Sequence, residues 1–206
     1  MNIAFLSDIH GNYKAFRKVI SELSDARIDR IYYLGDYLNY FKDGDKCLDL
    51  IIETQTGCIK GNHEQIILDI IDGKSKLYKY KNKYNDSVKD TLKKLKNRHI
   101  DFLKKLKDKK VIKINKKKLL LAHGSPWDPK FYCYPNKKKI WENKINNYKY
   151  NIIILGHTHY KMKIKCKNKL ILNPGSIGQP RDGSAHGSWL EYTVNSNQFK
   201  FKKIFY

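Results

Sequence analysis

Five short apolar runs in this 206-residue sequence are each followed by side chains that can bind a metal ion or move a proton. The runs IAFL (3–6), IYYL (31–34), LLLA (119–122) and IIIL (152–155) are long enough for a buried strand and too short for a helix, and TGCIK (56–60) is a weaker fifth. The polar residues that follow these runs are Asp8, His10, Asp36, Asn62, His63, His123, His157 and His159.

Without His63, this set offers two carboxylates, one amide and four imidazoles. Such donors suit borderline divalent cations, among them manganese, iron, zinc, nickel and cobalt. Seven ligands are too many for one ion that keeps an open position and about right for two, with one carboxylate between them. A single histidine after a strand is more often an ordinary polar residue. However, five of the seven histidines fall at these positions, which favours one shared site.

The expected strands explain how residues far apart in sequence could meet. Helix-like stretches at 13–23 and 45–54 alternate with the first apolar runs, which is typical of an α/β sheet. Ligands of such sheets bind at the carboxyl ends of the strands. Glycines beside four of the polar clusters allow sharp turns. Side chains two apart at an extended strand end, as in Asp8 and His10, are expected to point the same way.

The rest of the chain completes a mixed α/β pattern. Apolar residues in segment 84–108 recur at spacings of three and four, which predicts two short amphipathic helices whose lysine-rich face is solvated. After residue 160, lysine alternates with apolar residues, as in antiparallel strands with one wet face. We expect a single domain over 1–206, with a helical insertion around 75–110 and a β-rich C-terminal third.

The formal charge of +22 raises nucleic acid as a partner. Only five of the 42 basic residues are arginine, and the abundant Lys, Asn, Ile and Tyr resemble a drift toward AT-rich codons, so nucleic-acid binding is not favoured. The four cysteines form no C-x-x-C pair and are expected to be reduced. No signal peptide or membrane span is recognisable, so we expect a cytoplasmic protein with no membrane partner. The oligomeric state stays open.

The motifs SDIHG, GDYLNY, GNHE, AHGSP and GHTH, followed by LNPGSIGQPRDG, resemble those of the calcineurin-like metallophosphoesterases, in particular the small bacterial and archaeal phosphodiesterases. The resemblance implies a four-layer αββα sandwich of two mixed sheets flanked by helices, with two divalent metal ions, manganese first among them, at the strand ends. By motif position it assigns Asp8, His10 and His159 to one ion, Asn62, His123 and His157 to the other, Asp36 to both, and His63 to neither.

The same resemblance implies hydrolysis of phosphodiesters or small phosphorylated or nucleotide substrates. A hydroxide shared by the two ions attacks phosphorus, and His63 assists the leaving group. The alternatives are a serine/threonine-type protein phosphatase and a non-catalytic metal-binding scaffold. Protein phosphatases of the superfamily carry an aspartate where this chain has Asn39, which argues against the first. The presence of all eight site residues argues against the second.

Several other residues receive a weaker interpretation. Arg181, in a Gly/Pro-rich loop, could grip a substrate phosphate with two hydrogen bonds. The aromatic residues around SPWDPKFYCYP could stack on a base or pack under a long loop, and the turn Asn173–Ser176 is expected to be structural. His99 and His186 are expected to be ordinary polar residues. The aromatic residues concerned are Trp127, Phe131, Tyr132 and Tyr134.

Overall fold

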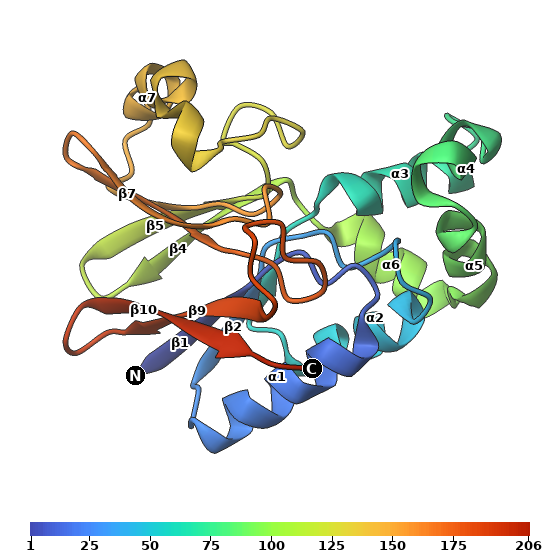
Figure 1. Cartoon of the computed structure of the whole chain (residues 1–206), viewed down its shortest axis with the longest axis horizontal. Helices are drawn as coiled ribbons and strands as arrows, with labels where there is room; N and C mark the ends of the chain where they lie inside the picture. Colours follow the sequence, from blue (N-terminus) through green and yellow to red (C-terminus); the bar gives the residue numbers. More distant parts are fainter.

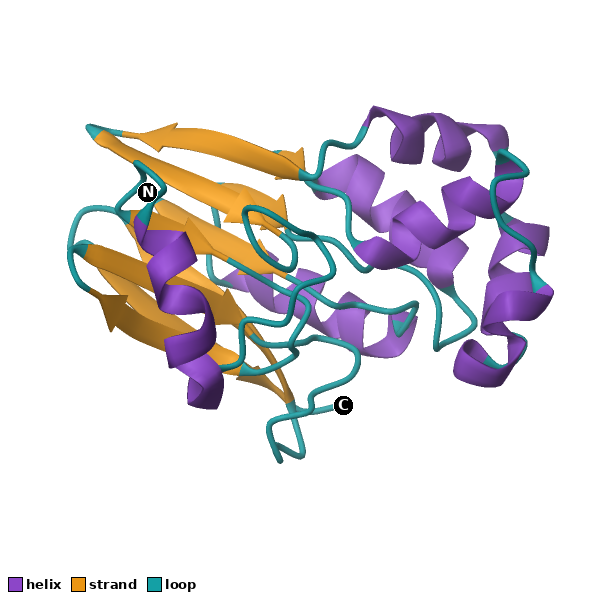
Figure 2. Ribbon diagram, turned by 90° about the horizontal axis from the view of Figure 1, so that it is seen from above, coloured by secondary structure: helices purple, strands orange, loops and turns teal.

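The computed structural model describes all residues from 1 to 206 and shows two five-stranded mixed sheets packed face to face (Figures 1 and 2). In the first sheet β1 is parallel to β2, β2 is parallel to β3, and β9 runs antiparallel to both β1 and β10. Its strands, in spatial order, are β10 (Gln198–Ile204), β9 (Gly187–Thr193), β1 (Asn2–Leu6), β2 (Arg30–Tyr33) and β3 (Gly57–Cys58).

The second sheet has a parallel centre and antiparallel edges. Strands β5, β6 and β8 run parallel, while β4 and β7 pair antiparallel with β5 and β8. Its order is β4 (Lys109–Ile114), β5 (Lys117–Ala122), β6 (Ile152–Ile154), β8 (Lys169–Pro174) and β7 (Lys161–Cys166).

Helices cover both outer faces, so the molecule has four layers and three apolar cores. The first core joins the first sheet to α1, α2, α3, α5 and α6, and the second lies between the sheets. The third joins the second sheet to α7. The helices are α1 (Tyr13–Asp25), α2 (Gly44–Thr54), α3 (Asn62–Ile71), α4 (Tyr78–Tyr84), α5 (Ser87–Lys94), α6 (Asn97–Lys105) and α7 (Lys138–Asn146), with a 3₁₀ turn at Pro135–Lys137.

The predicted αββα sandwich is confirmed, and the details differ in the lysine-rich parts. Segment 84–108 holds α5 and α6 as expected, and α4 precedes them. Strand β4 (KKVIKI) directly follows this segment and was not predicted, because only Ile112 and Ile114 of its residues are buried. Helix α7 was also not predicted. No helix has the length and apolar character that crossing a membrane requires.

The parallel strands place the carboxyl ends of β1 and β2 in one sheet, and of β5 and β6 in the other, at the same end of the sandwich. Figure 1 shows the loops that follow these strands gathered between the sheets and the helical lobe of α3 to α6. The strands themselves are almost wholly buried, and the chain becomes polar only where each one ends.

Candidate metal centre

The structure brings together seven of the eight residues predicted for the site, all of them buried, and places Asn62 at the start of α3. The conformation of the pairs is not the extended one we expected. Asp8 and His10 have φ angles of 55° and 54°, and His157 and His159 have 68° and 60°. The expectation of extended backbone is wrong, because the chain turns into the left-handed region directly after each strand.

One cluster consists of Asp8, His10 and His159, which are fully or almost fully buried. His159 Nε2 lies 3.3 Å and His10 Nε2 lies 3.8 Å from Asp8 Oδ1. The two imidazole nitrogens are 3.0 Å apart. Asp8 Oδ1 has no hydrogen-bond partner, whereas Oδ2 accepts the His157 backbone N–H at 3.0 Å. Three donor atoms therefore converge on one point.

A second cluster consists of Asp36, His123 and His157. His123 Nε2 lies 3.1 Å from Asp36 Oδ2 and has no other hydrogen-bond partner. Asp36 also approaches the first cluster, because the same Oδ2 atom lies 4.0 Å from His10 Nε2. Its Oδ1 atom accepts the His63 backbone N–H at 2.9 Å. Asp36 thus stands between the clusters, and His157 and His159 point into different ones.

Asn62 is the first residue of α3, and its Oδ1 atom is buried without a partner. An unpaired buried carbonyl oxygen is costly unless a ligand satisfies it. With Asp8 Oδ1 and His123 Nε2 it makes three orphaned atoms in the region of the clusters, which fits a site that binds cations. The unpaired Asn62 oxygen thus has the chemistry expected of a metal ligand.

The second nitrogen of each clustered imidazole is within hydrogen-bond distance of a backbone carbonyl, which fixes the ring. This arrangement is usual for histidines that bind metals, because it leaves the other nitrogen free to act as ligand. The pairs are His10 Nδ1 with Leu38 O (3.2 Å), His123 Nδ1 with Leu34 O (2.7 Å), His157 Nε2 with Lys130 O (3.1 Å) and His159 Nδ1 with Gln179 O (2.5 Å).

Burial and mutual charge set the protonation of the centre. Burial lowers the pKa of His157 to about 4 and that of His10 well below 6.5, so both rings are neutral at pH 7. Burial also opposes the ionised form of Asp36, but the charges of His123 and His63 outweigh it and hold the pKa well below 3.8. For His123, burial lowers the pKa, but the charge of Asp36 and its hydrogen bond outweigh burial and raise the pKa to about 9. A bound cation would replace that proton.

His63 forms a third group of possible metal ligands with His10 and Asp36. Its Nε2 is 3.8 Å from Asp36 Oδ2, and its Nδ1 pairs with the Asn39 side-chain Nδ2 at 3.1 Å. Burial lowers the pKa of His63 to about 4. Asn39 therefore orients this histidine. With the Asn39 amide donating to Nδ1, the imidazole carries its proton on Nε2, which faces the centre.

Arg181 lies on the rim of the centre, where its backbone N–H donates to His159 O at 3.5 Å while its side chain contacts neither cluster. Its Nη2 donates to the Tyr40 hydroxyl at 3.2 Å and to Gln179 Oε1 at 2.8 Å. The Tyr40 ring in turn packs edge-on against His10, with ring centroids 4.8 Å apart. The guanidinium is thus separated from the clusters by the Tyr40 ring. Its Nη1 and Nε groups form no hydrogen bond within the protein.

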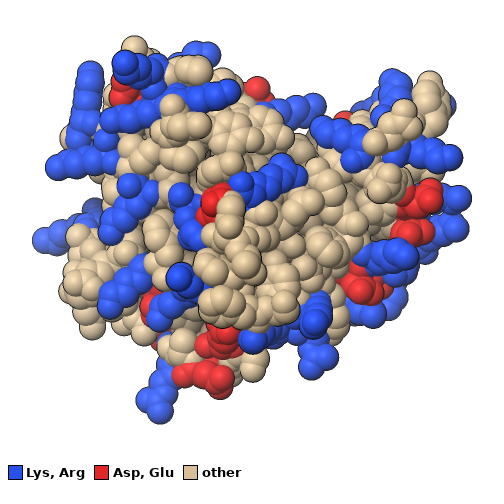
Figure 3. All heavy atoms as spheres, viewed as in Figure 1, with Lys and Arg blue, Asp and Glu red and all other residues tan.

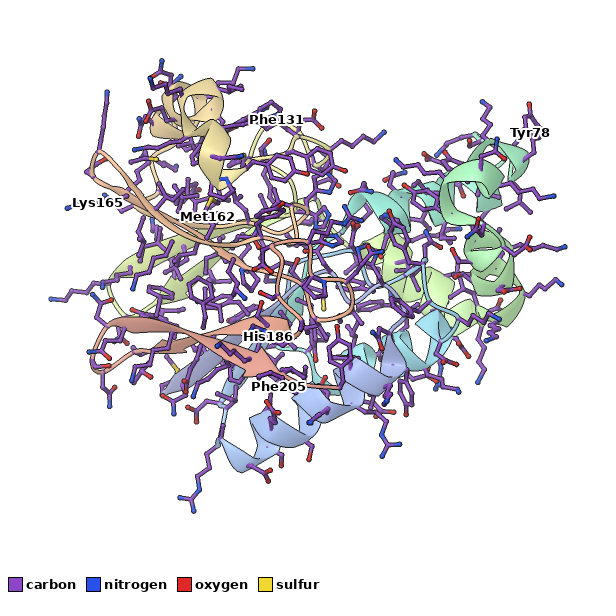
Figure 4. All side chains as sticks on the ribbon, viewed as in Figure 1. Tyr78, Phe131, Met162, Lys165, His186 and Phe205 are labelled. Carbon is purple, nitrogen blue, oxygen red and sulfur yellow. The ribbon has the colours of Figure 1, made fainter.

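The four aromatic residues considered for base stacking divide into two pairs. Trp127 and Phe131 pack against the core under α7, as Figure 4 shows for Phe131. Tyr132 is 41% exposed and stacks on the His157 ring at 3.9 Å, and Tyr134 stacks on Tyr132 at 5.4 Å. Only the second pair lies at the rim of the centre.

The remaining histidines stand apart from the centre. His99 is buried in α6, where its Nε2 lies 2.5 Å from Asp49 Oδ1 of α2. His186 is half-buried beside Phe205, at a ring distance of 5.2 Å. Both contacts fit the ordinary structural interpretation.

Four residues that support the centre were not singled out as site residues. Glu64 accepts the backbone N–H groups of Asp36, Tyr37, Leu38 and Gly61. Asn173 Nδ2 donates to Gly156 O at 2.7 Å, and Ser176 Oγ donates to Asp8 O at 2.7 Å, so the turn 173–176 ties together two ligand loops. Tyr40 connects Arg181 to His10 and His63. Glu64 and the turn stand inside quoted motifs, GNHE and NPGS, which was the available signal.

Comparisons with known proteins agree with this geometry. Residues 1–196 match the calcineurin-like phosphoesterase superfamily domain. An uncharacterized protein of Methanocaldococcus jannaschii is 29% identical over 99% of this chain and 87% of its own. A phosphodiesterase of the same organism is 24% identical over 85% of this chain and 83% of its own. A metallophosphoesterase structure from Sphaerobacter thermophilus superposes with a TM-score of 0.83 at 23% identity, covering 100% and 89% of the two chains. The chain belongs to the calcineurin-like phosphoesterase superfamily.

Proposed function

We propose that this protein is a metal-dependent phosphoesterase that hydrolyses phosphodiesters or small phosphorylated and nucleotide substrates. The observation that carries the proposal is the pair of buried carboxylate–imidazole clusters with Asp36 between them and His63 alongside. Asp8, His10 and His159 would hold one divalent ion, and Asn62, His123 and His157 the other, with Asp36 contacting both. Donor chemistry admits manganese, iron, zinc, nickel or cobalt, and manganese is our first choice.

The bound ions would supply a water of lowered pKa and would neutralise the phosphoryl oxygens. The chain's own residues determine the rest. Asp36 and Asp8 are ionised and His10 and His157 are neutral at pH 7, so the cation ligands need little deprotonation. Burial lowers the pKa of His63 to about 4, so the ring is neutral at pH 7, and its Nε2–H group, oriented by the Asn39 contact at Nδ1, would donate a hydrogen bond to the leaving oxygen of the substrate.

The rim favours an anionic substrate that carries an aromatic or nucleoside group. Arg181 can donate to a phosphate oxygen through the part of its guanidinium that Tyr40 and Gln179 leave free. The exposed Tyr132, stacked on His157, offers a surface for a planar leaving group. The M. jannaschii relative named as a phosphodiesterase supports a diester over a phosphoprotein, as does Asn39.

The test is a screen of metal-reconstituted protein, with manganese first. The substrates are a bis-aryl phosphodiester, an aryl monophosphate, dinucleoside polyphosphates, cyclic nucleotides and a phosphopeptide. We expect turnover of the diester to exceed that of the phosphopeptide. His63→Gln should keep both metals and lose about 100-fold or more in kcat, whereas Asp36→Asn should lose the second equivalent of metal. The absence of turnover on every substrate, with metal at full occupancy, would leave the scaffold alternative.

A further inference from the structure

A second polar hollow lies at the opposite end of the sandwich from the metal centre. It has a volume of about 1120 Å³ and is enclosed by the ends of the β4–β5, β7–β8 and β9–β10 hairpins. It includes the amino-terminal residues of β5, β6 and β8, whereas the metal centre lies beyond the carboxyl ends of β5 and β6. The three hairpin ends gather at the left of Figure 1, where Figure 3 shows projecting basic side chains.

Lysine dominates this hollow. Eight of its 16 lining residues are lysine and none is Asp or Glu, although lysine makes up fewer than a fifth of the chain. None of the eight forms an ion pair anywhere in the structure, whereas Lys161 and Lys202 on the same strands pair with Asp182 and Glu191. The positive charge of the hollow is therefore not balanced by the protein itself.

Two of these lysines are exposed residues of the edge strand β7. Lys163 and Lys165 of β7 stand opposite Leu172 and Leu170 of β8, which face the core between the sheets. Cross-strand partners share a face, so both lysines point to the side of the sheet that elsewhere carries leucine and isoleucine. Both lysines are exposed although they lie on this face, so the inner side of this edge of the sandwich is open and basic. Lys165 marks this end of β7 in Figure 4.

The character of the lining identifies the ligand. None of the large apolar side chains that are exposed on the protein lies in the hollow, so nothing there could enter a membrane. Phe199 is 7% exposed and already stacked on Tyr192. Tyr150 packs against the third core, and the Lys149 ammonium lies 5.8 Å from its ring centroid, so both aromatic rings of the hollow already have partners. The hollow contains no arginine that could read a base edge by two hydrogen bonds. Its cations are point charges suited to successive phosphates.

We propose that this lysine hollow binds a linear inorganic polyphosphate chain, independently of the metal centre. Its ligand is recognised through charge alone, by lysines contributed from both sheets. Lys117 of the second sheet already contacts Asn197 of the first, so an anion in the hollow would bridge the two sheets.

The test is calorimetric titration of the full-length protein with linear polyphosphate at about 0.1 M salt, where charges farther apart than about 10 Å are screened. We expect the variant Lys163→Gln/Lys165→Gln to weaken binding at least about tenfold. The slope of log K against log salt should fall by about 1.4, since each lost phosphate contact removes about 0.7 for a single-stranded polyanion. Lys165→Arg, which keeps the charge, should retain binding.

The matched control is Lys104→Gln/Lys105→Gln on α6, which removes the same charge from two exposed lysines outside any ion pair. It should change the dissociation constant less than about twofold, as expected for charges beyond the screening length. Asp36→Asn should leave polyphosphate binding intact, which separates this site from the proposed catalytic one. The proposal would be overturned if the wild-type protein did not bind polyphosphate, or if both double variants lost binding equally. It would also be overturned if Asp36→Asn lost binding, or if the protein preferred single-stranded RNA to polyphosphate. Urea unfolding checks that each variant is folded.

Discussion

Arg181 is the residue at which substrate recognition can be tested apart from metal binding. Its side chain touches neither cluster and is linked to them through the Tyr40 hydroxyl, while its backbone N–H donates to His159 O. We predict that Arg181→Ala lowers kcat/KM for the best phosphodiester by about 10- to 100-fold, since a charge-assisted hydrogen bond contributes about 1.5–3 kcal/mol. The loss should be mainly in KM, with unchanged metal content. Steady-state kinetics and metal analysis of the purified variant check this.

Two variants sharpen the interpretation of Arg181. Arg30→Ala removes an arginine that is exposed on β2 and should leave both kinetic constants unchanged. Arg181→Lys keeps the charge but not the planar fork, and should recover only part of the loss. If Arg181→Ala has wild-type kcat/KM on every active substrate, the arginine has no part in binding.

The site residues were predictable individually because each one follows an apolar run and has a side chain that binds metals. Residues whose side chains form hydrogen bonds with backbone groups of other loops were harder to recognise. Asn173 and Ser176 use single hydrogen bonds to carbonyl groups of distant loops, and nothing in a turn-like NPGS sequence identifies those partners. Glu64 stands next to His63 in the sequence, yet its role depends on the loop after β2, which only the fold brings to it.

Among the structural elements, the junction of β2 and α3 depends on the buried Glu64 carboxylate. Its two oxygens accept four backbone N–H groups, three from residues 36–38 and one from Gly61. Burial and the Asp36 charge raise the pKa of Glu64 to about 7, against the effect of these donors. We predict that Glu64→Gln destabilises the fold by about 2–3 kcal/mol, since the amide NH₂ would face N–H donors. Urea unfolding of the metal-free protein measures it.

Glu22→Gln on α1 makes the same chemical change at a half-exposed position without an ion pair, and it should alter the free energy of unfolding by less than about 0.5 kcal/mol. Glu64→Gln should also weaken metal binding, because the hydrogen bond from the Asp36 backbone N–H to the Glu64 carboxylate holds Asp36 in position. A variant with wild-type stability and wild-type metal affinity would show that the four hydrogen bonds do not hold this junction.

Apolar periodicity predicted helices and strands well where one face of the element is buried. It predicted them poorly where most residues of the element are exposed lysines. Strand β4 was missed because only two of its residues are buried. Helix α4 (YKYKNKY) lies inside the helical insertion expected around 75–110, but it was not recognised as a separate helix because only one of its residues is buried. The left-handed backbone of Asp8, His10, His157 and His159 was not predictable either, since only a few per cent of non-glycine residues adopt such angles, although Asp and His do so more often than most. These conformations are held by the surrounding hydrogen bonds, which depend on the tertiary structure.

At the scale of the whole molecule, the metal centre connects the two sheets. Asp8, His10 and Asp36 come from loops of the first sheet, while His123, His157 and His159 come from loops of the second. Cations bound there would therefore link the halves of the sandwich as well as create a catalytic site. The sequence predicted that these residues meet, but not the strand order that distributes them between the two sheets.

This division predicts that metal binding stabilises the entire fold. At a free manganese concentration about 100-fold above the dissociation constant, binding to the native state alone adds about 2.7 kcal/mol. For a chain of this size that corresponds to an increase in Tm of about 5–10 °C. Differential scanning calorimetry of EDTA-treated protein, with and without manganese, measures the shift. Asp36→Asn should show a clearly smaller one, because it lacks the carboxylate between the clusters. A Tm of the wild-type protein that does not depend on manganese would contradict the proposed centre. It would show that the four buried imidazoles and two buried carboxylates of the clusters do not bind the cation.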